Sequence, residues 1–412
     1  MKQGWEYKTL GDVLAVLRNG VNCKQDKKGV GDKISRIESI SNANFDIDKV
    51  GYTTLSKTDK EKYRLVKGDI LFSHINSPIH VGKTALFNSD EEVYHGVNLL
   101  LMRSKPFLNG SYFEHYLKFL FQNGYWKGLC KQSVNQASVN QQDINKVEIN
   151  YPKSLPEQQR IVAILDEAFA AIAQAKANAE QNLKNAKELF ESYLQSVFEN
   201  KVEGWEEKKL IEITKVINGY AFPSKDFQST NSIKSIKITN VGVKEFVEET
   251  DNYLPEKYKT TSQDYEVKEG NIVIALTRTI IAAGLKVAIV PHSYEGALLN
   301  QRVAALIPNE EVIYQRYLYN FLITDGVAKY VLSRVNTLMQ PNLSINDLKN
   351  LSIPVPQLKD QQTIVQKLDA LSAETKQLET IYQQKINDLD ELKKSILQKA
   401  FAGELNTTAL EV

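Results

Sequence analysis

The stretch SPIHVGKT at residues 77–84 offers the clearest candidate for phosphate chemistry, because its Gly-Lys-Thr ending matches the end of a nucleotide-binding P-loop. A P-loop also requires a glycine where this chain has Ser77, and a helix where strand-like Ala-Leu-Phe follows. The hexamer GVGDKI at 29–34 is likewise only half of a dinucleotide-binding fingerprint. Neither motif therefore predicts a nucleotide site.

Metal and nucleophile chemistry has no better support. The five histidines lack metal-ligand spacing, and Cys23 and Cys130 cannot form a structural zinc site by themselves. No two prolines are adjacent, so the chain lacks the Pro-Pro pair with which DNA-adenine methyltransferases hold their target amine. We predict no catalytic residue, no metal site and no cofactor on this chain. A solitary methyltransferase or nuclease is the enzyme class left to test.

Recognition chemistry is better represented, in loops rich in Arg, Lys, Asn, Gln, Ser and Thr. Arg, Asn and Gln make bidentate contacts with guanine or adenine edges, and Lys neutralises phosphates. A single polar loop is more often ordinary solvated surface, but these loops recur at matching places in two halves of the chain. The predicted DNA-binding residues are Arg18, Asn19, Lys24, Lys27, Lys28, Arg36, His74, Asn76, Ser77, His80, Lys83, Lys131, Ser133, Asn135, Gln136, Asn218, Lys225, Thr277, Arg278, Thr279, Lys286, Arg302, Arg334 and Asn336.

Composition is that of a multi-domain globular protein: 412 residues, 42% hydrophobic and 25% charged. The sequence contains no apolar run of membrane-spanning length, no signal peptide and too few cysteines for a disulfide framework, so we expect a reducing cytoplasm. The net charge of +1 conceals six excess positive charges in 1–155, against three and two excess negative charges in 156–200 and 358–412. Such a balanced total predicts that tight DNA binding needs a partner.

An internal repeat of about 200 residues organises the chain. QQRIVAILDE (158–167) returns as QQTIVQKLDA (361–370), 203 residues later. ELFESYLQSVF (188–198) returns at the same offset as ELKKSILQKAF (391–401). The repeating unit is one mixed domain followed by one long helical stretch.

The mixed domains repeat more loosely. VKGDILFS matches KEGNIVIA, which predicts buried strands entered through glycine turns, and GVNLLL aligns with LLNQRV through Asn98 and Asn300. Residues 110–124 and 313–326 have the pattern of amphipathic helices closed by glycine.

Each long helical stretch carries a heptad-like apolar seam, which only Thr375 and Lys393 interrupt in the second copy. Helices of about 42 residues would be about 63 Å long. The predicted coiled-coil seam residues are Ile161, Leu165, Ile172, Leu183, Phe190, Ile364, Leu368, Leu378, Tyr382, Leu389 and Ile396.

The short linker NKVEG (200–204) sets the orientation of the helices, because it cannot run back along the first one. The second helix must therefore return antiparallel. We predict an α+β fold of two similar mixed α/β domains separated by a long antiparallel two-helix coiled coil, with a pseudo-twofold internal repeat. The predicted domains are 1–155 and 201–357. The first is followed by a helix at 156–200, and the second by a helix and a C-terminal tail at 358–412.

With these residues in view, the chain resembles the specificity subunit of type I restriction–modification systems over essentially its whole length. The resemblance rests on Gly-Trp at 4–5 and 204–205, GDIL at 68–71, GKTAL at 82–86, Asn-Gln at 300–301, the helix openings EQQRIVAILD and DQQTIVQKLD, and the helix endings LQSVF and LQKAF. Each motif is weak alone, and their duplicated order is the specific signal. One departure is Asn271, where the first copy has Asp69.

The resemblance implies that each mixed domain is a target-recognition domain that reads one half of a bipartite double-stranded DNA site. The conserved spacer helices would fix the gap and dock two modification subunits, through which restriction subunits join. S-adenosylmethionine, ATP and Mg would be bound by those partners, and this subunit would catalyse nothing. The alternative is a coiled-coil scaffold whose end domains bind proteins.

Overall fold

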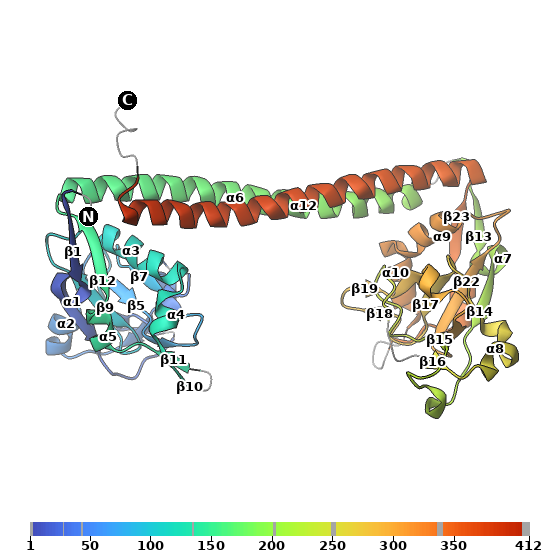
Figure 1. The fold of residues 1–412 in the computed structure, drawn as a ribbon, viewed down its shortest axis with the longest axis horizontal. Helices are drawn as coiled ribbons and strands as arrows, with labels where there is room; N and C mark the ends of the chain where they lie inside the picture. Colours follow the sequence, from blue (N-terminus) through green and yellow to red (C-terminus); the bar gives the residue numbers. More distant parts are fainter. Residues whose placement is uncertain are drawn as a thin grey trace. The chain divides into compact units, whose positions relative to one another are not determined.

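The computed structural model describes residues 3–27, 29–42, 44–133, 136–200, 203–248, 253–335 and 341–405. It divides into two compact units, one made of Met1–Glu180 with Gln384–Val412, the other of Gln181–Gln383. Each unit contains one mixed domain, the beginning of one long helix and the end of the other (Figure 1). None of the described helices has the length and apolar character needed to cross a membrane.

The first unit is built on a four-stranded sheet in the order β2-β9-β5-β7, in which all neighbours are antiparallel. Smaller sheets, β4-β3-β8, β10-β11-β6 and β1-β12, surround it. Its strands are β1 (Trp5–Thr9), β2 (Leu14–Asn19), β3 (Asp32–Ile34), β4 (Gly51–Thr53), β5 (Ile70–Phe72), β6 (Ile75–Asn76), β7 (Thr84–Leu86), β8 (Val93–Tyr94), β9 (Leu100–Ser104), β10 (Lys131–Ser133), β11 (Gln136–Ser138) and β12 (Glu148–Pro152). Its helices are α1 (Leu10–Val13), α2 (Lys57–Tyr63), α3 (Gly110–Gln122), α4 (Tyr125–Leu129), α5 (Gln141–Asn145) and the first part of α6 (Leu155–Glu199).

The second unit repeats this plan with the sheets β14-β22-β17-β20, β16-β15-β21, β18-β19 and β13-β23. Its strands are β13 (Glu206–Lys209), β14 (Thr214–Asn218), β15 (Ile233–Ile236), β16 (Tyr253–Leu254), β17 (Ile272–Ala275), β18 (Ile280–Ile281), β19 (Gly284–Leu285), β20 (Val287–Ile289), β21 (Leu298–Leu299), β22 (Val303–Pro308) and β23 (Ser352–Val355). Its helices are α7 (Leu210–Ile213), α8 (Lys257–Thr261), α9 (Gln315–Leu322), α10 (Asp325–Arg334), α11 (Ile345–Lys349) and the first part of α12 (Leu358–Ala402).

The two units match strand for strand in three sheets. The order β2-β9-β5-β7 corresponds to β14-β22-β17-β20, and β1-β12 to β13-β23. The edge sheets β4-β3-β8 and β16-β15-β21 each combine one antiparallel and one parallel pairing. The predicted α+β class and internal repeat are therefore confirmed.

The register of these sheets corrects one predicted alignment. Opposite the last residue of β2 lies Leu100, and opposite the last residue of β14 lies Ala304. Two residues earlier, Asn98 therefore corresponds to Arg302. The predicted match of Asn98 with Asn300 is wrong, because the second copy has two additional residues between β17 and β22.

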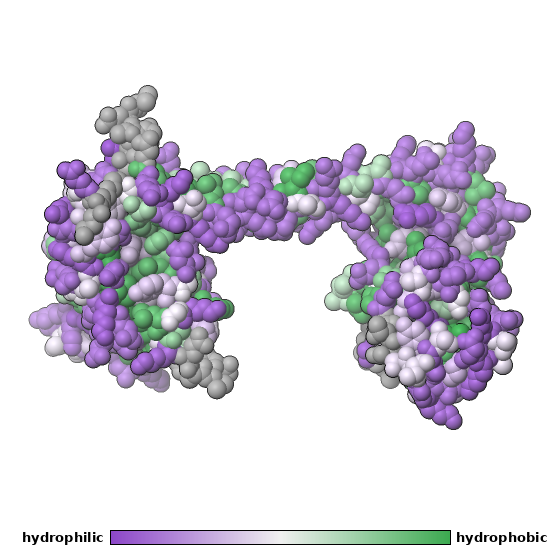
Figure 2. Space-filling model, in the orientation of Figure 1, coloured by the Kyte–Doolittle hydropathy of each residue, from purple (hydrophilic) through white to green (hydrophobic). Residues whose placement is uncertain are grey.

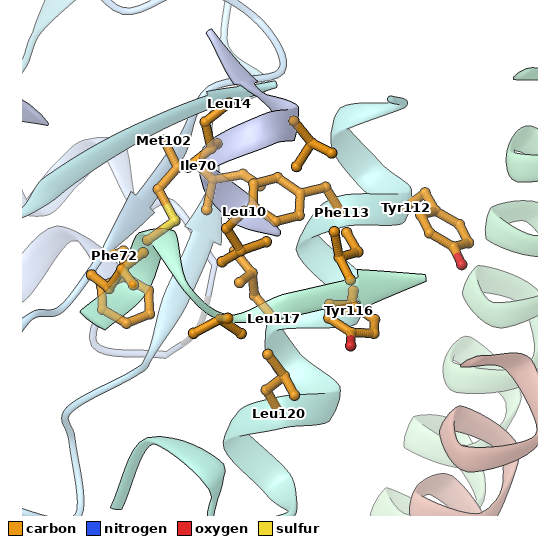
Figure 3. Packing of buried hydrophobic residues seen from close by; sticks show 14 of the residues in the cluster. Leu10, Leu14, Ile70, Phe72, Met102, Tyr112, Phe113, Tyr116, Leu117 and Leu120 are labelled. Carbon is orange, nitrogen blue, oxygen red and sulfur yellow. The ribbon is translucent and has the colours of Figure 1, made fainter. Parts of the chain in front are cut away.

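Helix α3 packs on the main sheet of the first unit. Its backbone begins at Asn109, whose side chain accepts a hydrogen bond from the Tyr112 N–H at 3.0 Å, and it ends before Gly124, which has φ +71°. Its Phe113 and Leu117 lie one turn apart in a single buried cluster with sheet residues such as Ile70, Phe72 and Met102 (Figure 3). Burying each such side chain contributes about 1.5–3 kcal/mol.

A buried glutamine fastens the start of helix α6 to the first domain. The Gln158 amide oxygen accepts a hydrogen bond from the Asn109 N–H at 2.7 Å. Its NH₂ group donates to the carbonyls of Phe107 at 3.1 Å and Pro152 at 2.7 Å. One fully buried side chain thus joins α6 to the start of α3 and the end of β12.

Gln361, the counterpart of Gln158, makes the same contacts at the start of α12. Its oxygen accepts from the Tyr314 N–H at 2.7 Å, and its NH₂ group donates to Val312 at 3.0 Å and Pro356 at 2.8 Å. Only an amide of this length supplies one acceptor and two donors, so the repeated glutamine has a physical reason.

Each domain also receives the end of the other long helix, through equivalent phenylalanines. In the first unit the Phe401 ring lies 5.4 Å from the Tyr112 ring and 5.0 Å from the Tyr116 ring. In the second unit the Phe198 ring lies 5.1 Å from the Tyr317 ring. The two helices are antiparallel within each unit, because each unit pairs the beginning of one with the end of the other.

The structure refines the predicted helix seam. Ile161, Leu165, Ile172 and Leu368 are buried, and Leu183, Phe190, Ile364, Tyr382, Leu389 and Ile396 are half-buried. Leu378 is 37% exposed, contrary to prediction, whereas Thr375 one turn earlier is buried and its hydroxyl donates to the Leu371 carbonyl. Figure 2 shows the visible surface of both long helices as mainly hydrophilic, with scattered hydrophobic residues.

A buried ion pair explains the substitution at Asn271. In the first unit the fully buried Asp69 carboxylate accepts hydrogen bonds from Arg103 at 2.6 and 2.8 Å. In the second unit Asn271 replaces the aspartate, and Ile307 occupies the place of the arginine. The aspartate and its arginine partner are absent together in the second unit, since an aspartate alone at this position would be a buried charge without a partner.

We expect Gln158→Leu to lower the free energy of unfolding of the first unit by about 2–4 kcal/mol, because it leaves two carbonyls and one N–H without partners. Urea unfolding measures the loss, and hydrogen exchange at Asn109 and Tyr112 locates it. Gln159→Leu is the matched control, since Gln159 is exposed. Equal effects of the two variants would contradict this role for Gln158.

Candidate nucleic-acid interface

Strand pairing brings two of the predicted polar loops of the first unit together. β11 pairs with β6, so that Ser138 lies opposite Ile75 and Ala137 opposite Asn76. The Val139 N–H donates to the His74 carbonyl at 2.9 Å. Residues far apart in sequence therefore form one edge of the domain.

A polar pocket of about 600 Å³ lies at this edge. Asn19 at the end of β2 and the loop before β9 also contribute to it. Its lining residues are Asn19, Ile37, His74, Ile75, Asn76, Ser77, Val97 and Asn98. Four predicted DNA-binding residues, Asn19, His74, Asn76 and Ser77, therefore gather in one place.

A chain of hydrogen bonds fixes the protonation of His74. The Gln141 NH₂ group donates to the Asn19 side-chain oxygen at 2.7 Å, so the Asn19 NH₂ group faces His74 Nε2 at 3.3 Å. Burial lowers the pKa of His74, so the ring is neutral and its proton lies on Nδ1. That N–H is buried and has no partner among the residues that the structure describes.

A second buried histidine supports the turn next to this pocket. His95 is fully buried, and its Nδ1 lies 3.4 Å from the Ser35 hydroxyl oxygen, which accepts the Gly96 N–H at 3.0 Å. Burial lowers the pKa of His95 to about 3, so it stays neutral at physiological pH.

Three predicted cations of the first unit are already used inside the domain. Arg18 donates to the Lys62 carbonyl and lies over the Tyr63 ring at 5.2 Å. Arg36 pairs with Glu38, and the Lys83 ammonium donates to the Ser41 carbonyl at 3.2 Å. Each of these side chains therefore has a structural role within the domain, and its contact with DNA stays a prediction.

The remaining predicted residues of the first unit differ in exposure and in their partners. Lys24 and Lys131 are exposed, whereas Lys27 is 3.9 Å from Glu38, and His80 is half-buried with an unpartnered Nδ1. Lys28 and Asn135 lie outside the described residues, as do the side chains of Ser133 and Gln136.

In the second unit the equivalent loop holds Arg278 in an unusual backbone conformation. Its φ is +49°, in the left-handed region, which costs a residue other than glycine about 1–2 kcal/mol. The flanking residues hold it there, since Thr277 pairs with Asn342 and the Thr279 N–H donates to the Pro341 carbonyl at 3.0 Å. The Arg278 side chain is exposed.

One other prediction for this unit needs correction, because Thr279 is fully buried and therefore unsuited to direct DNA contact. The half-buried Lys286 donates to the Ile238 carbonyl, and its DNA contact stays a prediction. Lys225, Asn218 and Arg302 are exposed, Thr277 is half-buried, Arg334 lies over the Tyr330 ring at 5.3 Å, and Asn336 lies outside the described residues.

Sequence reasoning missed Asn98 and Gln141. Asn98 is exposed and lines the pocket, but its misalignment hid its correspondence with Arg302. Gln141 orients Asn19 from 122 residues away, a contact that only the folded sheet creates. Among the described residues, no three His, Cys, Asp or Glu side chains group as metal ligands.

One protein family matches the sequence of both units. The family described as type I restriction modification DNA specificity domain matches residues 2–185 and again residues 202–388. The chain belongs to this specificity family. The two matched segments each combine one mixed domain with most of the helix that follows it.

Individual members of the specificity family are similar in sequence to this chain over half of its length or more. The putative type I restriction enzyme MjaX specificity subunit of Methanocaldococcus jannaschii is 28% identical, covering 98% of this chain and 94% of the relative. The EcoR124I/EcoR124II specificity subunit of Escherichia coli is 30% identical over 53% of each chain.

Solved structures show the same fold. A chain from a type I R-M system, studied for complex assembly and conformational transition, has TM-score 0.73 at 18% identity, covering 98% of this chain and 99% of its own. The HsdS subunit of Thermoanaerobacter tengcongensis has TM-score 0.65 at 18% identity and 98% coverage of both chains.

Stability of the first domain should depend on His95 protonation. Because the pKa of His95 is about 3 in the fold and about 6.5 when unfolded, only the unfolded chain takes up this proton between those values. We therefore expect unfolding free energy to fall as pH drops through this window, by at most about 1.4 kcal/mol per pH unit from this group.

His95→Gln should make that slope shallower while shifting stability above pH 7 by a constant. Urea midpoints measured between pH 4 and pH 8 give both slopes. Identical slopes for the two proteins would show that His95 titrates normally in the fold.

Proposed function

We propose that this chain is the sequence-specific DNA-recognition subunit of a type I restriction–modification complex. Each mixed domain reads one half of a bipartite site on double-stranded DNA. The observation that carries this proposal is duplication: two domains of one topology present different polar side chains at matched loop positions. Membership of the specificity family supports the same function.

We further propose that the antiparallel helices fix the gap between the half-sites and dock two modification subunits. The net negative charge of 156–200 and 358–412 favours protein partners over phosphates. S-adenosylmethionine, ATP and Mg then act on the modification and restriction subunits, in the cytoplasm. This chain contributes recognition and no catalytic group.

Coexpression with its modification subunit in a host that lacks DNA methylation should produce adenine methylation at a split motif with a constant gap. Sequencing of modified bases identifies both half-sites. The free chain should bind DNA weakly, and the modification subunit should make binding stronger and sequence-selective. A folded, associated complex that methylates nothing would favour the scaffold alternative.

Inserting one heptad after Glu180 and another after Gln383 should widen the gap or abolish methylation. Seven helical residues add about 10 Å, which corresponds to about three base pairs. Methylome sequencing of the double insertion measures the new gap. Inserting into α6 alone is the control, because it shifts one helix against the other, and an unchanged gap in the double insertion would refute the ruler.

A further inference from the structure

The pocket of the first unit has a counterpart of different chemistry in the second. β2 and β14 end at equivalent asparagines, Asn19 and Asn218, and the strand registers make Asn98 equivalent to Arg302. β5 and β17 pair identically with their neighbours.

Phe72 in β5 and Ile274 in β17 occupy the same register position, so His74 and Leu276, two residues later, are equivalent. The hydrogen bonds agree, because Val139 donates to the His74 carbonyl and Leu343 to the Leu276 carbonyl, each at 2.9 Å. Two residues further, Asn76 corresponds to Arg278.

The side chains left free at these positions differ between the units. In the first unit Asn76 is occupied, since its oxygen accepts from the Ser77 N–H and its NH₂ group donates to Ser73. Asn98 is exposed with no partner among the described residues, and the His74 Nδ1–H nearby is unsatisfied. The free group at the surface there is therefore one amide, that of Asn98, because the His74 N–H is buried.

In the second unit the free groups at these positions are two guanidinium groups and the exposed amide of Asn218. Arg278 and Arg302 are both exposed, and neither forms an ion pair with a residue that the structure describes. The backbones of the two segments are joined, since the Leu276 N–H donates to the Arg302 carbonyl at 2.8 Å. Leu276 adds no polar group.

We propose that these matched positions determine which purine each domain reads, adenine through Asn98 beside His74 and guanine through Arg278 and Arg302. This inference rests on the proposed function, because it assigns base chemistry to the same two interfaces. It names residues for single bases and leaves the rest of each half-site to other contacts.

The donor and acceptor patterns of the bases support this assignment. Adenine presents an acceptor at N7 and a donor at N6 in the major groove, which an amide matches with its NH₂ group and its oxygen. Guanine presents two acceptors, N7 and O6, which the paired donors of a guanidinium match.

Backbone geometry supports a recognition role for Arg278. Residues held in the left-handed region concentrate at functional sites, because neighbouring structure must hold them there. Glycine would occupy this turn without strain, whereas arginine carries a guanidinium to the loop tip. The backbone bonds of Thr277 and Thr279 on either side hold the Arg278 backbone in this conformation.

The test compares methylomes of the complete complex with single variants. Arg302→Asn and Arg278→Asn should each reduce selectivity for a guanine in one half-site by about ten- to a hundredfold, leaving the other half-site and the gap unchanged. Asparagine is chosen at 278 because it tolerates positive φ. Lys329→Asn, an exposed residue of α10, is the control and should change neither half-site.

Arg278→Lys separates base reading from phosphate attraction. Lysine keeps the charge but loses the paired donors, so guanine selectivity should fall as it does in Arg278→Asn. Unchanged selectivity with a uniform loss of methylation would instead make Arg278 a phosphate contact and overturn its assignment.

Asn98→Ala should relax selection of an adenine in the other half-site. A wild-type motif without guanine in the half-site that the arginine variants affect would overturn the inference but not the proposed function. Absence of any bipartite methylation by the wild-type complex would count against the proposed function itself.

Discussion

The buried side-chain amides of Gln158 and Gln361 are the contacts on which the rest of each unit depends. A long amphipathic helix has little intrinsic preference for where a neighbouring domain attaches, because an apolar stripe slides with small changes in packing energy. Directional hydrogen bonds remove that freedom. One amide that bonds to two other segments sets the helix start, the α3 or α9 start and the last strand in a single geometry.

The aromatic clusters complete this arrangement from the opposite helix. Phe401, at the end of α12, enters the hydrophobic core of the first domain. Phe198, at the end of α6, enters the hydrophobic core of the second domain. Each core is therefore incomplete until both long helices are present. The helix endings are repeated in sequence for this reason, and the seam between them matters less, as the exposure of Leu378 and the buried Thr375 illustrate.

Sequence patterns that repeat at fixed spacing predicted the architecture well, because helix periodicity and duplication are local and countable. The fold class and the family followed from them. The site was harder, since its members meet through strand pairing. Gln141 reaches Asn19 across 122 residues, and a two-residue length difference before β22 concealed the equivalence of Asn98 and Arg302. Charge alone also does not reveal that Arg18, Arg36 and Lys83 have partners within the domain.

The partners of the two glutamine amides are all main-chain atoms: the N–H groups of Asn109 and Tyr314, and the carbonyls of Phe107, Pro152, Val312 and Pro356. Hydrogen bonds of this kind do not depend on the side chains of the domain that they attach. Recognition loops can then diverge by mutation or recombination without weakening the attachment of their domain to the helix. The architecture can therefore be kept while the specificity changes. The equivalent positions Asn98 and Arg302 differ, whereas the glutamine contacts are the same in both units.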